Sequence, residues 1–207
     1  DTLRLVFTSR PMQMLIPIIF YTGACLGFNS AMYPLAYQDR PKDGVVNLIS
    51  KDYVGYVAAT FFLANSGCSY LWGKIIPRIG RRPLFALTLF THVAYYTLSY
   101  LFAERTSGLE HGSGGAYAAV FAGSIIFALG DSVLESQVPA IIQSPTFFPD
   151  ERDRDAANSV LRLWQSLGFT VQFAIGIIVP SNVVVQVAFL FPLLFIAIAS
   201  LVILDRW

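Results

Sequence analysis

The stretch that decides the fold is Gly73-Lys74-Ile75-Ile76-Pro77-Arg78-Ile79-Gly80-Arg81-Arg82. It is a basic connector with a proline and two glycines, and it joins two apolar stretches, Tyr53 to Ile76 and Leu84 to Ala103. Each apolar stretch has about the 20 residues that an α-helix needs to cross a bilayer. The connector is too short to form a domain of its own. It therefore predicts a tight hairpin of two membrane helices.

The rest of the chain repeats this alternation. The six predicted spans are Met12 to Tyr37, Tyr53 to Ile76, Leu84 to Ala103, Ala116 to Ser144, Ala157 to Pro180 and Val183 to Leu204. The connectors are Asp39 to Gly44, Pro77 to Pro83, Glu104 to Gly115, Pro145 to Asp155 and Ser181-Asn182. The sequence thus predicts an all-α, polytopic membrane protein in which residues 1–207 form one bundle of six transmembrane helices.

The composition agrees with a membrane protein. Apolar residues make up 55% of the 207 residues and charged residues only 13%, whereas a soluble domain has about 25% charged residues. The formal net charge is +1, so no basic face is available and nucleic-acid binding is excluded as a function. The two cysteines, Cys25 and Cys68, both lie inside apolar stretches, which indicates buried free thiols.

The basic residues predict the orientation of the bundle. With six spans, both termini and the second and fourth connectors share one side of the membrane. Ten of the 14 basic residues lie near that side: Arg4, Arg10, Lys74, Arg78, Arg81, Arg82, Arg152, Arg154, Arg162 and Arg206. The other four are Arg40, Lys42, Lys51 and Arg105. Because the side richer in Lys and Arg faces the cytoplasm, we expect both termini of this chain to be cytoplasmic.

The connector after the second span resembles the signature loop of the major facilitator superfamily, Gly-x-x-x-Asp-Arg-x-Gly-Arg-Arg. Five positions match at the correct spacing: Gly73, Arg78, Gly80, Arg81 and Arg82. In that family the loop joins the second and third helices of each half and takes part in gating. Here Pro77 replaces the signature Asp, which removes a carboxylate expected to help lock one gating state. A generic basic loop on the cytoplasmic side is the alternative interpretation.

Other segments narrow this resemblance to the C-terminal half of the Unc-93-like branch of the superfamily. They are Cys68 to Lys74, Leu129 to Gln137, Ala156-Ala157-Asn158 and Leu161 to Phe169. The resemblance implies a twelve-helix protein in a plasma or endosomal membrane, so this chain, which begins at Asp1 without Met, is expected to be a piece that lacks an N-terminal six-helix half. Some members of the branch regulate potassium channels or traffic receptors, and others are presumed transporters.

Two carboxylates in the fourth span are the most informative residues. Asp131 and Glu135 are four residues apart and share one helix face. A carboxylate in mid-membrane costs at least ~2.5–3.5 kcal/mol unless it is paired, hydrated or protonated. We predict that Glu135 pairs with Arg162 of the fifth span, and that Asp131 faces a polar cavity and couples transport to a proton or cation. The alternative is a structural charge cluster that joins two helices.

Other polar residues lie inside the predicted spans. Asn29, Asn65, Gln165 and Gln172 either line a central cavity or hydrogen-bond between helices. His92 stands alone in the third span and is interpreted as a core histidine. Pro139 removes the backbone donor for the carbonyl of Glu135 and favours a kink at this place.

The sequence offers two functional hypotheses. One is a secondary transporter that moves a small solute or ion by alternating access. The other is a transport-inactive subunit that regulates an ion channel, as some relatives do, or assists a membrane receptor. No motif of an enzyme and no Cys/His spacing of a metal site occurs in the chain, so neither catalysis nor a cofactor or metal is predicted. The expected partners are the bilayer and the missing half and, under the regulatory hypothesis, a channel or receptor subunit.

The orientation is testable by cysteine labelling of the full-length protein in intact cells. A cysteine at Ser113 should react with an impermeant reagent from outside, because the third connector is expected to be extracellular. A cysteine at Pro83 should not react until the cells are permeabilised. The reverse pattern would overturn the orientation.

Overall fold

A computed structural model describes residues 2–36, 49–103, 113–179 and 182–206. Its regular structure consists of helices, and the expected all-α class is thus confirmed for these residues. The helices are α1 (Thr2–Thr8), α2 (Arg10–Gly27), the π-helix η1 (Phe28–Met32), α3 (Tyr33–Ala36), the 3-10 turn η3 (Lys51–Tyr53), α4 (Val54–Ile79), α5 (Arg82–Ala103), α6 (Gly114–Ile142), α7 (Glu151–Ile178) and α8 (Val183–Leu204).

Five helical segments are long and apolar enough to cross a membrane. They are Arg10–Ser30, Arg82–Phe102, Gly114–Ile142, Glu151–Ile178 and Val183–Leu204. The helix α4 is equally long, with 26 residues, but it is not among them, because polar residues such as Asn65, Ser66 and Ser69 lower its mean hydropathy. The number of crossings therefore stays a prediction. Parts of three predicted connectors lie outside the described residues: Asp39 to Gly44, residues 104–112 and Ser181. The basic residues Arg40, Lys42 and Arg105 are among them.

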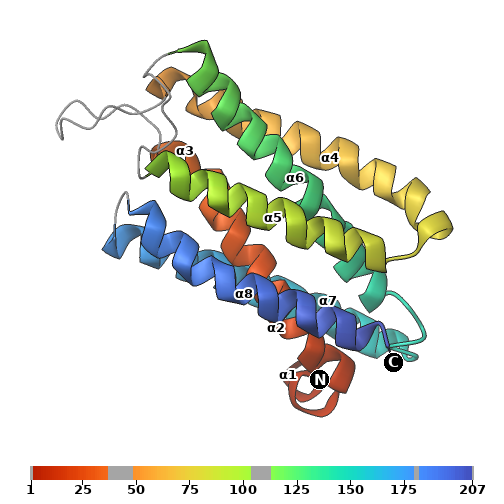
Figure 1. Ribbon diagram of the computed structural model, residues 1–207. Helices are drawn as coiled ribbons and strands as arrows, with labels where there is room; N and C mark the ends of the chain where they lie inside the picture. The colour runs from red at the N-terminus through yellow and green to blue at the C-terminus, as the bar shows by residue number, and fades with distance from the viewer. Residues whose placement is uncertain (1, 37–48, 104–112, 180–181, 207) are drawn as a thin grey trace.

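The helix packing shows that the bundle consists of two structurally equivalent units of three helices each. Helix α2 packs against α7 and α8, α6 packs against α4 and α5, and α5 packs against α8. Exchanging the unit α2–α4–α5 with the unit α6–α7–α8 leaves this pattern unchanged. Figure 1 shows that α2 and α6 begin at opposite ends of the bundle, so the two units run in opposite directions. The two central helices, α2 and α6, are in consequence the most enclosed.

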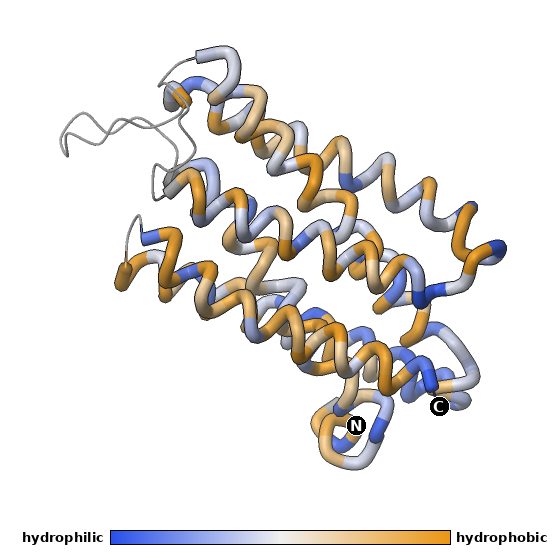
Figure 2. The backbone as a smooth tube through the Cα atoms, in the orientation of Figure 1, coloured by the Kyte–Doolittle hydropathy of each residue, from blue (hydrophilic) through white to orange (hydrophobic). Residues whose placement is uncertain are grey.

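Both chain termini and two connections gather at one end of the bundle. The chain termini, the α4–α5 turn and the α6–α7 connector all lie there (Figure 1). Arg82 at the start of α5 donates from Nε to Oδ2 of Asp205 after α8, at 2.7 Å. Figure 2 shows hydrophilic segments at this end and mostly apolar colour along the middle of the helices. This arrangement agrees with the expectation that these four segments share one side.

The loop resembling the superfamily signature is a tight turn between α4 and α5. Gly80 adopts a positive φ of 78°, which glycine tolerates because it has no Cβ, and its N–H closes α4 on the carbonyl of Ile76 at 2.9 Å. Gly73 lies on the exposed side of α4, and no atom of the described residues comes within 4 Å of a Cβ built on it, so this glycine makes no close helix contact in the described part of the chain.

Helices α2 and α7 approach closely through two glycines. A Cβ at Gly23 would overlap the backbone carbonyl of Gln165, and a Cβ at Gly168 would overlap the backbone carbonyl of Phe20. A Cβ at Gly27 would lie 3.3 Å from the carbonyl oxygen of Phe169. Gly23 and Gly27, four residues apart on α2, thus form a small-residue helix-packing motif. The close approach fixes the position of Gln165 along the axis of α2. Gln165 is part of the site described below.

Replacing Gly168 by Ala should weaken this packing. The added methyl overlaps the backbone of Phe20, which cannot move without shifting α2, so we expect a loss of about 1–3 kcal/mol in the free energy of unfolding. The matched control is Gly55→Ala, because open space surrounds Gly55 and Ala favours a helix. Thermal unfolding of the purified full-length variants measures both. Equal melting temperatures for the two variants would contradict the packing.

Candidate functional site

Asp131 lies on α6 where three helices meet, and none of its surface is exposed. Asn65 of α4 donates from Nδ2 to its Oδ2 at 2.6 Å. The thiol of Cys25 on α2 lies 3.8 Å from its other oxygen, Oδ1, at the distance of a weak S–H donor bond. The carboxyl group of Asp131 thus joins α4, α2 and α6.

Among the residues that the structure describes, Asp131 has no cationic neighbour. No Lys, Arg or His of the described residues comes within the 4.0 Å of an ion pair. An amide and a thiol are modest compensation for a charge, since an ionised carboxylate in an apolar interior loses far more hydration energy than two such bonds return. The site therefore favours a protonated carboxyl group or one that holds a bound cation.

Glu135 lies one turn further along α6 and is half-buried. Gln165 of α7 donates from Nε2 to its Oε1 at 2.8 Å. No described residue donates to its Oε2. A cavity of about 120 Å³ opens beside this side chain, between α2, α6 and α7; its lining is Thr22, Leu134, Glu135, Val138, Pro139, Leu161, Arg162 and Gln165.

The contacts of these carboxylates differ in detail from those predicted. Glu135 and Arg162 line the same cavity and interact electrostatically, but their charged atoms lie beyond the 4.0 Å of a direct ion pair. The reason is the rotation of α7, which turns Gln165 towards Glu135 and leaves Arg162 exposed. Glu135 lines this cavity, whereas Asp131 is enclosed by the described residues of this chain, and its role in coupling stays a prediction.

The other predicted polar residues divide between the site and helix contacts. Asn65 holds Asp131, and Gln165 holds Glu135. Asn29, in the π-helix η1, accepts a bond at 2.8 Å from the hydroxyl of Tyr95 on α5. Gln172 donates to Gln186 of α8 at 3.0 Å. Asn29 and Gln172 therefore fit the alternative of interhelical hydrogen bonds.

A hydroxyl and imidazole cluster, which was not predicted, lies between α2 and α5, one turn of α2 from Cys25, the thiol that contacts Asp131. The hydroxyl of Tyr21 on α2 lies 2.6 Å from Nδ1 of His92 and 2.9 Å from the hydroxyl of Tyr96, both on α5. His92 is fully buried, as expected for a core histidine. The signal in the sequence was the spacing of four between Tyr21, Cys25 and Asn29, which places three polar groups on one face of a helix.

Neighbouring contacts fix α6 around Asp131. The Oγ1 of Thr88 on α5 donates to the carbonyl of Gly130 at 3.1 Å, and a Cβ at Gly130 would overlap Thr91. On the other side, Nε1 of Trp72 on α4 donates to the hydroxyl of Ser132 at 2.8 Å. These bonds on both flanks of Asp131 set the rotation of α6 and thus the direction of its carboxyl group.

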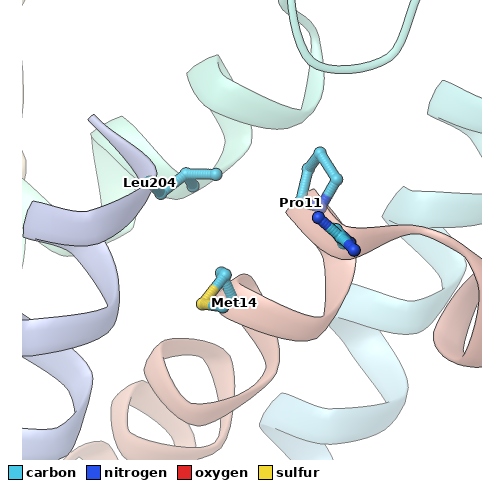
Figure 3. Close-up of a pocket in the computed structure, with 4 residues that line it drawn as sticks. Pro11, Met14 and Leu204 are labelled. Carbon is cyan, nitrogen blue, oxygen red and sulfur yellow. The ribbon is translucent and has the colours of Figure 1, made fainter. Parts of the chain in front are cut away.

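Two other hollows lie at the end of the bundle where the termini meet. Figure 3 shows Pro11, Met14 and Leu204 around a shallow hollow between α2 and α8, which together with Arg10 they line without leaving room for a water molecule. A wider polar hollow of about 440 Å³ lies between α1 and the start of α7; it is lined by Arg4, Leu5, Thr8, Ser9, Asp150, Arg152 and Asp153. The charges of that lining cancel, so it favours no ion of one sign.

No group of three or more His, Cys, Asp or Glu side chains arranged to hold a metal ion occurs among the residues that the structure describes. The arginines of the turn resembling the superfamily signature lie apart from Asp131: Arg78 is exposed, and Arg82 binds Asp205. The chemistry that this chain brings together is therefore that of two carboxyl groups, two carboxamides, a thiol and one arginine.

The chain is similar to known proteins over most of its length. The family model described as "Major Facilitator Superfamily" matches residues 12–206. Protein unc-93 homolog A from Homo sapiens is 29% identical over 81% of this chain and 33% of its own length. The protein of the same name from Xenopus laevis is 28% identical over 77% of this chain and 31% of its own length. The chain thus spans about a third of these relatives. No solved structure matches it.

The bond between Asn65 and Asp131 predicts a coupling between two substitutions. Asn65→Ala leaves the enclosed carboxyl group short of its stronger donor and should cost about 1–3 kcal/mol in the free energy of unfolding. Adding Asp131→Asn removes the group that needed the donor, so the double variant should recover part of that loss. Thermal unfolding of the unsubstituted protein, the two single variants and the double variant measures this coupling, with Ser66→Ala on the exposed side of α4 as a control. If the losses in the free energy of unfolding of the two single variants simply add in the double variant, the coupling is refuted.

Proposed function

The chain belongs to the major facilitator superfamily, and we propose that it is the C-terminal six-helix half of a secondary transporter of this type. The proposal includes α4 as a sixth span, so that residues 12–37, 53–76, 84–103, 116–144, 157–180 and 183–204 all cross the membrane. The exchange symmetry of the two three-helix units supports it, because each half of such a transporter contains two inverted three-helix repeats.

The proposed orientation places both ends of this chain in the cytoplasm, in a plasma or endosomal membrane. The end of the bundle that holds the termini also holds the α4–α5 turn and the start of α7, and it collects most of the basic residues of the described chain. An excess of Lys and Arg on the cytoplasmic side is the general rule. The solute path then lies between this half and an N-terminal half outside this chain.

The observation that carries the proposal is the enclosed carboxyl group of Asp131. It lies deep in an integral membrane protein, with an amide and a thiol as partners and without a described cation nearby. An ionisable group in a membrane interior is costly to keep, and such groups are typical of proton and ion pathways. A purely structural role would be better served by an asparagine at this place.

The proposed mechanism uses Asp131 as the proton or cation carrier. In the enclosed state the carboxyl group carries a proton or a cation and accepts the bond from Asn65. Rocking of the two halves opens a path to one side, water reaches Asp131, and the proton or cation leaves. Because Asn65 lies on α4 and Cys25 on α2, the charge on Asp131 changes the contacts between helices that must move.

Proton flux in liposomes tests this proposal. The full-length protein should carry protons down a pH gradient when solute is present, and Asp131→Asn should abolish the flux while the amount of folded protein stays near normal, because Asn keeps the size but cannot titrate. Asp155→Asn, at an exposed site in the first turns of α7, is the matched control and should keep the flux.

Two other results would count against the proposal. If Asp131→Asn prevents folding and the surviving protein keeps its pH dependence, then Asp131 is structural. If the unsubstituted protein carries no flux with any solute but copurifies with a channel or receptor subunit, the regulatory function replaces the transport function.

A further inference from the structure

The cavity beside Glu135 contains two opposite charges that do not meet. Glu135 on α6 and Arg162 on α7 both line it, yet their charged atoms lie beyond the 4.0 Å of an ion pair. Gln165 occupies one oxygen of Glu135 and leaves Oε2 without a described donor. Arg162 makes no direct ion pair with a described residue, and its charge acts on Glu135 across the cavity. Two opposite charges that face each other across a small cavity without direct contact leave room for a third molecule between them.

We propose that this cavity binds a small zwitterion, with its ammonium group on Glu135 and its carboxylate on Arg162, as the main-chain groups of an α-amino acid would present them. The inference rests on the proposed transport function and names the class of solute. A carboxylate alone would select a positively charged amine. A guanidinium alone would select a negatively charged acid. The two together select a molecule that carries both charges a short distance apart.

The chemistry of the walls fits each end of such a solute. An ammonium group donates three hydrogen bonds; the free Oε2 of Glu135 accepts one, and the hydroxyl oxygen of Thr22 keeps acceptor capacity while it donates to Ile19. Pro139, also in the lining, has no N–H for the carbonyl of Glu135, so the same turn of α6 has a further acceptor. At the other end, the fork of a guanidinium matches both oxygens of a carboxylate.

The size of the cavity fits as well. Its volume of about 120 Å³ is near that of a cavity of ~150 Å³ that accommodates benzene, a molecule of six heavy atoms. Alanine also has six heavy atoms. The apolar side chains of Leu134, Val138 and Leu161 in the lining suit an aliphatic side chain.

The other groups that face Glu135 leave this assignment intact. Asp131 lies one turn away on the same helix and is enclosed; because it carries a proton or a cation in this state, as proposed above, it adds no net charge to the cavity. Gln165 holds the carboxylate of Glu135 in place from α7. From α2 the lining receives Thr22, which is uncharged. The positive group at the cavity is Arg162, and the charges are thus separated across it.

Binding to the purified full-length protein tests the proposal. L-Alanine should raise the melting temperature in a saturable way, whereas ethylamine and propionate, each with one of its two charges, should have no effect at the same concentrations. Glu135→Gln and Arg162→Gln should each lower the affinity for L-alanine about tenfold or more. Arg152→Gln, at an exposed arginine of the same helix outside this cavity, should leave it unchanged.

The outcomes separate this proposal from the transport function. A response to ethylamine as large as that to L-alanine would mean a cation site, and a response to propionate an anion site; either overturns the zwitterion. Absence of any response to glycine, L-alanine and L-leucine, in a protein that still carries protons through Asp131, overturns the zwitterion and keeps the transport function. Saturable binding of L-alanine by a protein that carries no proton flux keeps the zwitterion site and overturns the transport function.

Discussion

A carboxyl group enclosed among apolar helices is stable only when donors are held against it, and Asp131 imposes this requirement on its neighbours. The donor from α4 is Asn65, and the thiol from α2 is Cys25. The bonds of Thr88 and Trp72 to the two flanks of Asp131 fix the rotation of α6. Four helices thus depend on one group whose charge can change, which makes the packing of this bundle sensitive to protonation.

The second carboxylate has a different environment because one turn of helix moves it from the interior to a cavity. Glu135 faces α7, and the glycines at positions 23 and 168 let α7 approach α2 closely. That approach brings Gln165 to Glu135, and Arg162 lines the same cavity without a direct ion pair to Glu135. Two carboxylates four residues apart therefore serve separate purposes: an enclosed carrier of charge and an open position for a solute.

The inverted arrangement of the two three-helix units explains why the site lies where it does. The first helices of the units, α2 and α6, cross the middle of the bundle and contact the other unit on several sides. Cys25 on α2 contacts Asp131 on α6. The peripheral helices add one carboxamide each, Asn65 of α4 to Asp131 and Gln165 of α7 to Glu135. The arrangement concentrates polar groups between the repeats, where a membrane protein can enclose them.

The sequence alone determined the helical class, the membrane environment and the place of the tight turn at Gly80, because apolar runs of bilayer length and the breaks between them are local properties. It also identified Asp131, Glu135, Asn65 and Gln165, because each is a polar residue in an apolar stretch. It did not determine their partners. Whether Arg162 or Gln165 meets Glu135 depends on the rotation of α7 about its axis, and that rotation is set by glycine contacts between helices more than 140 positions apart. The network of Tyr21, Cys25 and His92 was equally beyond local reasoning, since its members come from helices that only the tertiary structure brings together.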